Sequence, residues 1–389
     1  MVGIGMVFPI IPIIFTDPSS PSFLLHGYSQ SGQFIIAGLV TSLFGLMQFV
    51  ASPLLGELSD VYGRKRLLTL GVGVLAISQV FFGFGISIGS VALILFSRAV
   101  AGLAGANFSI AQAAIADVSE PKDRAKNFGL IGAAFGIGFI LGPVLGGLIA
   151  AYAHNAAAPF WFAGALGIVN LLFITLMLPE TRRITQAKEH SFSLLKGIHN
   201  IRAAFMDVDA RQVYTASFLY TAGFSFLVSF MGVLLVTRFS FNEAGVGTFF
   251  GVVGAWIVVT QLFLLRLLTS HYSERRILRY SMLVIATAMA VFPFLPNPMW
   301  LYIVMPFIAV PQALSMANLQ ALVSKSVSAD KQGAALGINS SLLAFSQGVV
   351  PLVAGFGSGL IGIAAPFIAG SLFIIAGWSA LFIFLKRSH

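Results

Sequence analysis

The chain has 389 residues, of which 58% are hydrophobic and 9% are charged, and its mean hydropathy is +0.94. A soluble domain carries about 25% charged residues, so this composition excludes a soluble protein and indicates one that crosses a membrane repeatedly. The net charge of +9 does not indicate a nucleic-acid partner, because nearly all of the 22 Lys and Arg residues flank apolar segments at one membrane face. The absence of cysteine excludes disulfides and thiolate metal sites.

Twelve apolar segments follow one another along the chain. Most have about 20–27 residues, enough for a helix to cross a hydrocarbon core of ~30 Å. We place them at residues 1–15, 31–55, 67–88, 92–116, 127–152, 158–178, 212–236, 245–268, 277–295, 299–322, 332–356 and 361–385. The pattern predicts an all-α integral membrane protein with twelve transmembrane helices.

The first segment is shorter than the others. As a helix, residues 1–15 reach only ~22 Å, and the chain opens directly in apolar sequence with no flanking cation. We therefore expect that the true first helix begins upstream of Met1 and is truncated here. The alternative is a short helix that bends at Pro9 and Pro12.

A charged stretch, Gly56–Leu68, separates the second segment from the third. We expect a short loop in which Gly56 and Gly63 allow sharp turns and close backbone approach. Asp60 lies where the second apolar segment leaves the lipid, and its carboxylate needs a cation or a helix N-terminus as its partner. The cations that hold this stretch on the cytoplasmic face are Arg64, Lys65 and Arg66.

The charges of the connecting segments predict the topology. Connections without Lys or Arg alternate with basic ones at 64–66, 122–126, 182–211, 275–279, 325–331 and 386–387. The positive-inside rule then places both termini in the cytoplasm. Residues 179–211 are the long hydrophilic connection, and we expect them to form a cytoplasmic linker between six-helix halves at 1–178 and 212–389. The halves repeat, since GPVLGG at Gly142–Gly147 corresponds to VPLVAG at Val350–Gly355.

Arg98 is the cation that lies well inside an apolar segment, in the pattern RAVAG that ends at Gly102. A buried arginine in lipid is costly, so it should face the bundle interior and find carbonyl or carboxylate partners. The pattern resembles the helix 4 motif of the major facilitator superfamily, which implies that Arg98 and Gly102 serve proton coupling or organise a central cavity. The alternative is a structural arginine bonded to helix carbonyls.

The fifth segment carries closely spaced small residues around a proline. Glycines at these spacings let one helix pack tightly against a neighbour, and the proline removes a backbone donor and bends the helix. The alternative is generic close packing, because glycine is common in membrane helices. The residues are Gly138, Gly142, Pro143, Gly146 and Gly147.

Amide side chains are the main polar groups at mid-membrane depth, and together they predict an amide-rich cavity without fixed negative charge. Such a cavity suits a moderately hydrophobic, neutral or zwitterionic compound. For each amide the alternative is an interhelical hydrogen bond, since a buried amide needs partners. The candidates are Gln48, Asn107, Gln112, Gln261, Gln312, Asn318, Asn339 and Gln347.

Three of these patterns resemble those of one transporter family. Gly56–Arg66 resembles the signature loop of the major facilitator superfamily, and Arg98–Gly105 resembles its helix 4 motif. The motif around Pro143 resembles the signature of its antiporters. The chain is most similar to the tetracycline-resistance and multidrug branch of drug/proton antiporters. In that branch an arginine of the signature loop pairs with an acid at the cytoplasmic end of helix 4, which implies a cytoplasmic gate of Asp60, Arg64 and Asp117.

The chain also departs from that branch. The tetracycline antiporters carry membrane-embedded acids in helices 1, 3 and 9, whereas the positions in helices 3 and 9 are Ser78 and Ile285 here, and the helix 1 position would precede Met1. None of the thirteen acids lies at mid-membrane depth. A proton-driven carrier needs a titratable group exposed alternately to both sides.

The sequence thus predicts a monomeric transporter of the cytoplasmic membrane that exports small organic compounds or drugs by alternating access, with protons as the coupling ion. One alternative is a uniporter or importer of a small metabolite, and another is a membrane receptor or scaffold on the same fold. No phosphate-binding loop, metal cluster or nucleophile elbow is present, so we expect no ATP hydrolysis, no cofactor and no enzymatic activity.

Overall fold

The computed structural model describes residues 2–119, 124–181, 211–327 and 332–382, together with residues 202 and 206. Within these residues every regular element is a helix. The helices of the first part are α1 (Val2–Gly5), α2 (Val7–Thr16), α3 (Gln30–Tyr62), α4 (Arg64–Ser87), α5 (Val91–Gly105), α6 (Asn107–Val118), α7 (Arg124–Ala153) and α8 (Ala158–Met177).

The second part has a matching run of long helices. They are α10 (Arg211–Phe239), α11 (Glu243–Val259), α12 (Leu265–His271), α13 (Glu274–Val291), α14 (Pro298–Val304), α15 (Pro306–Lys325), α16 (Gln332–Leu360) and α17 (Ala365–Phe382). A π-helical turn, Thr260–Leu264, joins α11 to α12, and a 3₁₀ turn, Phe292–Phe294, extends α13. We refer to residues 2–177 as the first half and to residues 211–382 as the second half.

Eleven helical stretches among the described residues are long and apolar enough to cross a membrane, and Val2–Thr16 is a shorter apolar helix. The predicted all-helical membrane fold is therefore confirmed. The short helix is broken at Met6 into α1 and α2, and Pro12 lies inside α2.

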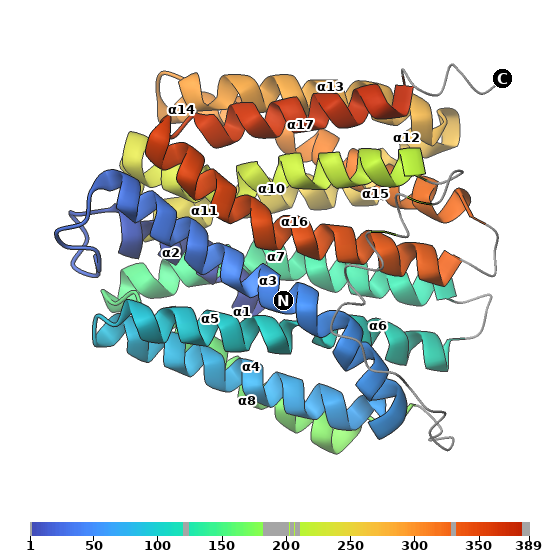
Figure 1. The fold of residues 1–389 in the computed structure, drawn as a ribbon, viewed down its shortest axis with the longest axis horizontal. Helices are drawn as coiled ribbons and strands as arrows, with labels where there is room; N and C mark the ends of the chain where they lie inside the picture. Colours follow the sequence, from blue (N-terminus) through green and yellow to red (C-terminus); the bar gives the residue numbers. More distant parts are fainter. Residues whose placement is uncertain are drawn as a thin grey trace.

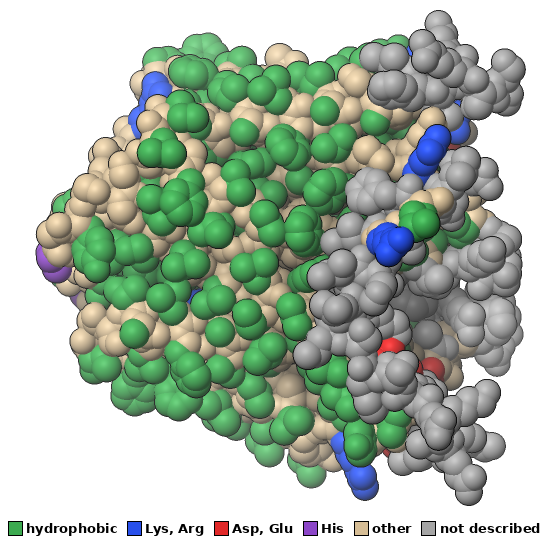
Figure 2. All heavy atoms as spheres, viewed as in Figure 1, with side chains coloured by type: hydrophobic (Ala, Val, Ile, Leu, Met, Phe, Trp, Pro, Cys, Tyr) green, Lys and Arg blue, Asp and Glu red, His purple; other side chains and the backbone are tan. Residues whose placement is uncertain are grey.

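The helices lie roughly along one axis, and their termini gather at two ends of the molecule (Figure 1). We call the end with Gly63, Val118 and Glu274 the inner end, and the end with Ser29, Gly89 and Asn297 the outer end, following the predicted topology. On the face shown in Figure 2, hydrophobic side chains are spread between the two ends. Such a surface suits lipid, where only helices with internally satisfied backbones are stable.

The halves are joined mainly by α3 with α16 and by α7 with α11 (Figure 1), and α2 also packs against α10 and α11. In the α3–α16 seam, a Cβ atom added to Gly45 would lie 2.5 Å from the carbonyl carbon of Gln347. One added to Gly38 would lie 2.5 Å from the carbonyl oxygen of Pro351. The absence of side chains at these glycines therefore lets the two backbones touch, which is how helices associate closely in membranes.

Hydrogen bonds reinforce the same seam. The hydroxyl of Ser42 donates to the carbonyl of Gly348, and the hydroxyl of Ser31 donates to the carbonyl of Gly359 at 2.6 Å. Both acceptors lie on α16 between mid-span and the outer end. The described seam is thus closed by backbone contact and by side-chain hydrogen bonds together.

The expected loop at Gly56–Leu68 is not a loop. Helix α3 continues to Tyr62 and α4 begins at Arg64, so Gly63 alone separates them. Its φ of +97° is a backbone conformation that favours glycine. Gly56 lies inside α3, and no described atom lies within 4 Å of an added Cβ there, so its predicted role in a turn is wrong. The chain remains helical past the apolar segment because a helix satisfies its own backbone groups at the membrane boundary.

We predict that Gly45→Ala destabilises the protein whereas Gly56→Ala does not. At Gly45 the added methyl group meets backbone atoms that have no freedom to turn aside, which should cost about 1–3 kcal/mol. At Gly56 the methyl group enters open space, and alanine favours the helix. Thermal unfolding of the purified protein in detergent measures both changes. Equal unfolding midpoints for the two variants would contradict the close approach in the α3–α16 seam.

Candidate functional site

A cluster of charged groups lies at the inner end, centred on the guanidinium group of Arg64. Its Nη2 lies 2.6 Å from Asp60 Oδ1, and its Nε lies 3.1 Å from Asp117 Oδ2. Its Nη1 donates to Ser59 Oγ at 2.5 Å and to the carbonyl of Gly56 at 3.5 Å. The side chain of Arg64 is 7% exposed and those of the two acids are 30% and 27% exposed. The guanidinium group is therefore enclosed between carboxylates that water still reaches.

This cluster ties three helix ends of the first half together. Asp60 is in the last turn of α3, Arg64 is the first residue of α4, and Asp117 is in the last turn of α6. Charge-assisted hydrogen bonds of this kind are shorter and stronger than neutral ones. The structure thus brings together Asp60, Arg64 and Asp117, which the sequence grouped as a gate. These ion pairs and hydrogen bonds link α3, α4 and α6, which all belong to the first half.

The neighbouring cations are arranged differently. Lys65 is half-buried and Arg66 is exposed, and neither side chain forms an ion pair that is recorded among the described residues. Both project from the first turn of α4 at the inner end. Their position agrees with a role in setting the topology rather than in the cluster itself.

Glu180, which sequence reasoning missed, completes the cluster. Its Oε1 accepts a hydrogen bond from the backbone N–H of Arg64 at 2.8 Å, and its Oε2 accepts one from the N–H of Lys65 at 3.1 Å. The carboxylate thereby satisfies N–H groups that the first turn of a helix leaves open. A Cβ at Gly63 would displace the end of the flexible Glu180 side chain, and the positive φ is what favours glycine at this position. The sequence did carry a signal for this cap, because the first turn of α4 has no acidic residue of its own and Glu180 lies just after α8.

Arg98 is buried in the first half, with 6% of its surface exposed. Its Nε donates to the carbonyl of Val40 at 3.3 Å, and its guanidinium carbon lies 4.7 Å from the centre of the Phe44 ring. An added Cβ at Gly102 would clash with the carbonyl of Phe44, so α5 packs directly on α3. Among the described residues Arg98 thus has a carbonyl and an aromatic partner, and no carboxylate within ion-pair distance.

The small residues of α7 face two neighbours. A Cβ atom added to Gly142 would lie 2.6 Å from the Cα of Gly5, and one added to Gly146 would lie 2.8 Å from the Cα of Met6. The missing side chains at both glycines therefore let the N-terminal helix pack directly on α7. A Cβ atom added to Gly5 would in turn lie 3.0 Å from the carbonyl oxygen of Gly138. This side of α7 therefore packs within the first half.

The other side of α7 meets the second half. An added Cβ at Gly147 would clash with the carbonyl of Glu243, and one at Gly247 would lie 2.5 Å from the carbonyl of Pro143. The motif of α7 is thus a packing surface with two faces, one for α1 and one for α11. It forms the α7–α11 seam, the second close contact between the halves.

The side chains of three of the eight candidate amides have a hydrogen-bond partner among the described residues. Gln48 donates to the carbonyl of Gly105 at 3.1 Å, Asn318 donates to that of Leu314 at 2.7 Å, and Asn339 accepts from Ser217 at 2.7 Å. The polar atoms of the Asn107 side chain and Oε1 of Gln312 are buried without a hydrogen-bond partner among the described residues. The remaining amides are Gln112, which is half-buried, and Gln261 and Gln347, which are exposed.

The space around the unpaired Gln312 is small. Together with Phe224, Met231, Phe250 and Met305 it lines a cavity of about 10 Å³ between α10, α11 and α15, which is room for about one water molecule. Aromatic rings also bridge the halves: the ring centre of Phe345 of α16 lies 5.6 Å from that of Phe49 of α3. Within the second half, the centre of the same ring lies 6.2 Å from that of Phe218 of α10.

Comparisons with known proteins agree with this arrangement. The family model described as Major Facilitator Superfamily matches residues 1–351. The tetracycline resistance protein, class C, of Escherichia coli is 26% identical over 359 residues, covering 90% of this chain and 85% of that protein. The quinolone resistance protein NorA of Staphylococcus aureus (strain MRSA252) is 27% identical over 360 residues, covering 91% of this chain and 85% of that protein.

Solved structures show the same fold. The crystal structure of the human organic anion transporter MFSD10 (TETRAN) matches this chain with a TM-score of 0.71 and 24% sequence identity. The match covers 98% of this chain and 97% of that one. At this identity the likeness concerns the arrangement of the helices alone.

We predict that Glu180→Ala lowers the stability of the inner end by about 1 kcal/mol, as expected for the loss of a helix cap. Glu180→Gln should lose less, because its amide oxygen still accepts a hydrogen bond. Hydrogen exchange of the Arg64 and Lys65 amides measures the effect directly, with Asp17→Asn in the outer loop as control. Unchanged exchange at both amides in Glu180→Ala would refute the cap.

Proposed function

The chain belongs to the Major Facilitator Superfamily, whose members are transporters rather than enzymes, and from this premise we propose that it exports small, moderately hydrophobic organic compounds across the cytoplasmic membrane. Export would proceed by alternating access, in which the two halves rock about a central site. The relatives support outward transport as the direction, since they are named as resistance proteins for tetracycline and for quinolones.

One structural observation carries the proposal, namely that glycines close both seams from mid-span to the outer end. Gly45 and Gly38 bring α3 onto α16, while Gly147 and Gly247 bring α7 onto α11. Release of a substrate to the outer side requires these contacts to separate. At these glycines the backbones meet without intervening side chains, so parting α3 from α16 would break the hydrogen bonds of Ser31 and Ser42 without unpacking side chains at the glycines themselves.

We assign the cluster of Asp60, Arg64 and Asp117 to the control of the inner end. A hydrogen bond to a charged group contributes about 1.5–3 kcal/mol, which corresponds to a ten- to hundredfold change in the ratio of two conformations if the bond exists in only one of them. The two partly exposed acids compete for one guanidinium group, so a small displacement of α6 relative to α3 would change how the charge is shared.

Coupling to protons is the finer part of the proposal. The acids of the described spans lie at their ends, with Asp60 and Asp117 at the inner end and Glu243 at the outer end. A proton would therefore be taken up at a membrane end rather than at mid-depth. An uncoupled uniporter is the competing function that this distribution favours.

The experiment is an accumulation assay in a bacterial host that lacks its own efflux pumps. We expect the chain to lower the accumulation of tetracycline or of a quinolone, and a protonophore to abolish the difference. A difference that survives the protonophore would replace proton exchange by uniport. No effect on any compound tested, from a chain shown to be present in the membrane, would refute drug export and favour a metabolite carrier.

We further predict that Arg64→Asp and Asp117→Arg each abolish transport, and that the double reversal restores part of it. Restoration should be incomplete, because Asp60 would then face the new carboxylate one helical turn away. The matched control is Arg66→Asp, which reverses an exposed charge in the same turn. Initial transport rates at equal protein levels decide the matter, and a double variant no better than either single one would contradict the pairing.

A further inference from the structure

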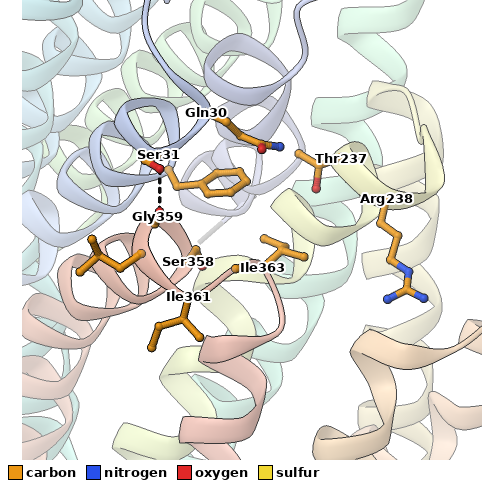
Figure 3. Close-up of a pocket in the computed structure, with 11 residues that line it drawn as sticks. Gln30, Ser31, Thr237, Arg238, Ser358, Gly359, Ile361 and Ile363 are labelled. Atoms are coloured by element: carbon orange, nitrogen blue, oxygen red, sulfur yellow. Dashed lines mark hydrogen bonds between the residues drawn. The ribbon is translucent and has the colours of Figure 1, made fainter.

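A cavity of about 440 Å³ lies at the outer end, on top of the α3–α16 seam (Figure 3). Its first-half wall is the beginning of α3, with Gln30, Ser31 and Phe34. Its second-half wall is formed by the end of α10 at Thr237 and Arg238 and by residues 358–363. Ligand sites commonly have volumes of about 300–1,000 Å³, so the space is large enough for a small organic molecule. We call it the outer cavity.

One hydroxyl group in its wall is unpaired. Ser358 is 2% exposed, and its Oγ has no hydrogen-bond partner among the described residues. A buried hydroxyl without a partner costs about 1–3 kcal/mol, which an acceptor atom of a ligand would recover. The nearby hydroxyl of Ser31 is already used, because it donates to the carbonyl of Gly359. The described wall therefore offers the hydroxyl of Ser358 and the side-chain amide of Gln30 as hydrogen-bonding groups.

Arg238 supplies the ionised group of the lining, and no carboxylate shares it. The guanidinium group sits at the rim, where its two Nη atoms donate to the carbonyls of Pro293 and Leu295. These two bonds leave further N–H donors of the side chain for another acceptor. The carbonyls of Ser358 and Gly359 at the end of α16 already accept hydrogen bonds, from Gly362 and Ser31.

Apolar side chains form a further part of the wall. Phe34 of the first half and Ile361 and Ile363 of the second half line the cavity, and Figure 3 shows the two isoleucines. A ligand that matches all of these groups has an anionic oxygen for Arg238, an apolar body for the phenyl and isoleucine side chains, and an acceptor for Ser358. An aromatic or short aliphatic carboxylate has this chemistry.

We propose that the outer cavity binds a small organic anion with an apolar body, and that the bound anion holds the outer end closed. The cavity exists only while α3 and α16 are in contact, because both halves contribute its walls. A ligand that binds one of two conformations shifts the population toward it. The anion would thus act as an inhibitor from the outer side. The closure of the outer end rests on the proposed alternating movement of the halves, whereas binding of the anion does not.

Benzoate is the probe for binding, and benzamide is its uncharged control. With the protein in nanodiscs of zwitterionic lipid, we expect benzoate to raise the thermal unfolding midpoint and benzamide to have a smaller effect. Arg238→Gln should weaken benzoate binding about tenfold, as expected for the loss of one charge-assisted bond. Ser358→Ala should weaken it as well, without removing the anchor of the 293–295 segment.

The matched control is Arg279→Gln, which removes an arginine from the inner end, where its guanidinium group lies over Phe382. This variant should bind benzoate like the parent protein. Benzoate binding that is unchanged in both Arg238→Gln and Ser358→Ala, equal stabilisation by benzamide, or no stabilisation by benzoate would each overturn the site.

Closure is measured separately, and the absence of cysteine from the chain makes labelling simple. Spin labels at Tyr152→Cys and Met299→Cys mark the outer end of each half, at side chains that are 92% and 72% exposed. We expect benzoate to shift the distance distribution toward its shorter component, and Arg238→Gln to remove the shift. Binding without any shift would overturn closure. A protein that binds benzoate but transports no drug would refute export alone, and one that exports drugs but does not bind benzoate would refute the site alone.

Discussion

Direct contact between helix backbones is the constraint on which the rest of this structure depends. In lipid no hydrophobic force drives one helix onto another, so association relies on close packing and on hydrogen bonds. Here glycines on α3, α7, α11 and α16 supply the close packing, and Ser31 and Ser42 supply hydrogen bonds to α16. The two halves meet along these seams, and therefore both the outer cavity and any central pathway are defined by them.

Charge is distributed so that it does not interfere with this packing. Arg64 is enclosed by Asp60 and Asp117 at the inner end, and Glu180 caps the helix that Arg64 begins. Arg98, deeper in the first half, is stabilised by a carbonyl oxygen and an aromatic ring. Ionised groups are thus placed where water or a fixed partner compensates them, since an uncompensated charge in a membrane is expensive. The outer cavity, with Arg238 at its rim, follows the same rule.

Some features of the site could be predicted because they depend on local spacing. Asp60 and Arg64 are four residues apart, which brings them together on any helix or tight turn. The glycines and Pro143 of α7 stand in one short stretch, so their role in close packing was readable, although their two different partners were not. Glu180 was missed because it lies more than a hundred residues beyond Arg64 and reaches it only through the path of α8. The prediction that the amides form one site stays a prediction; Gln48 and Asn339 are hydrogen-bonded to neighbouring helices, and Asn318 is bonded within its own helix.

The sequence by itself determined the membrane-spanning helices, the uneven distribution of charge and the family, because hydropathy and motif spacing are properties of consecutive residues. Only the tertiary structure decided that Gly56–Tyr62 is helix, that Gly63 is the single residue between two helices, and that Gly147 and Gly45 face the other half. Only the tertiary structure brought Ser358 and Arg238 to one cavity. The reason is physical: a helix has the same local geometry whichever neighbour it packs against, so contacts between distant segments are settled by how all the helices fit together.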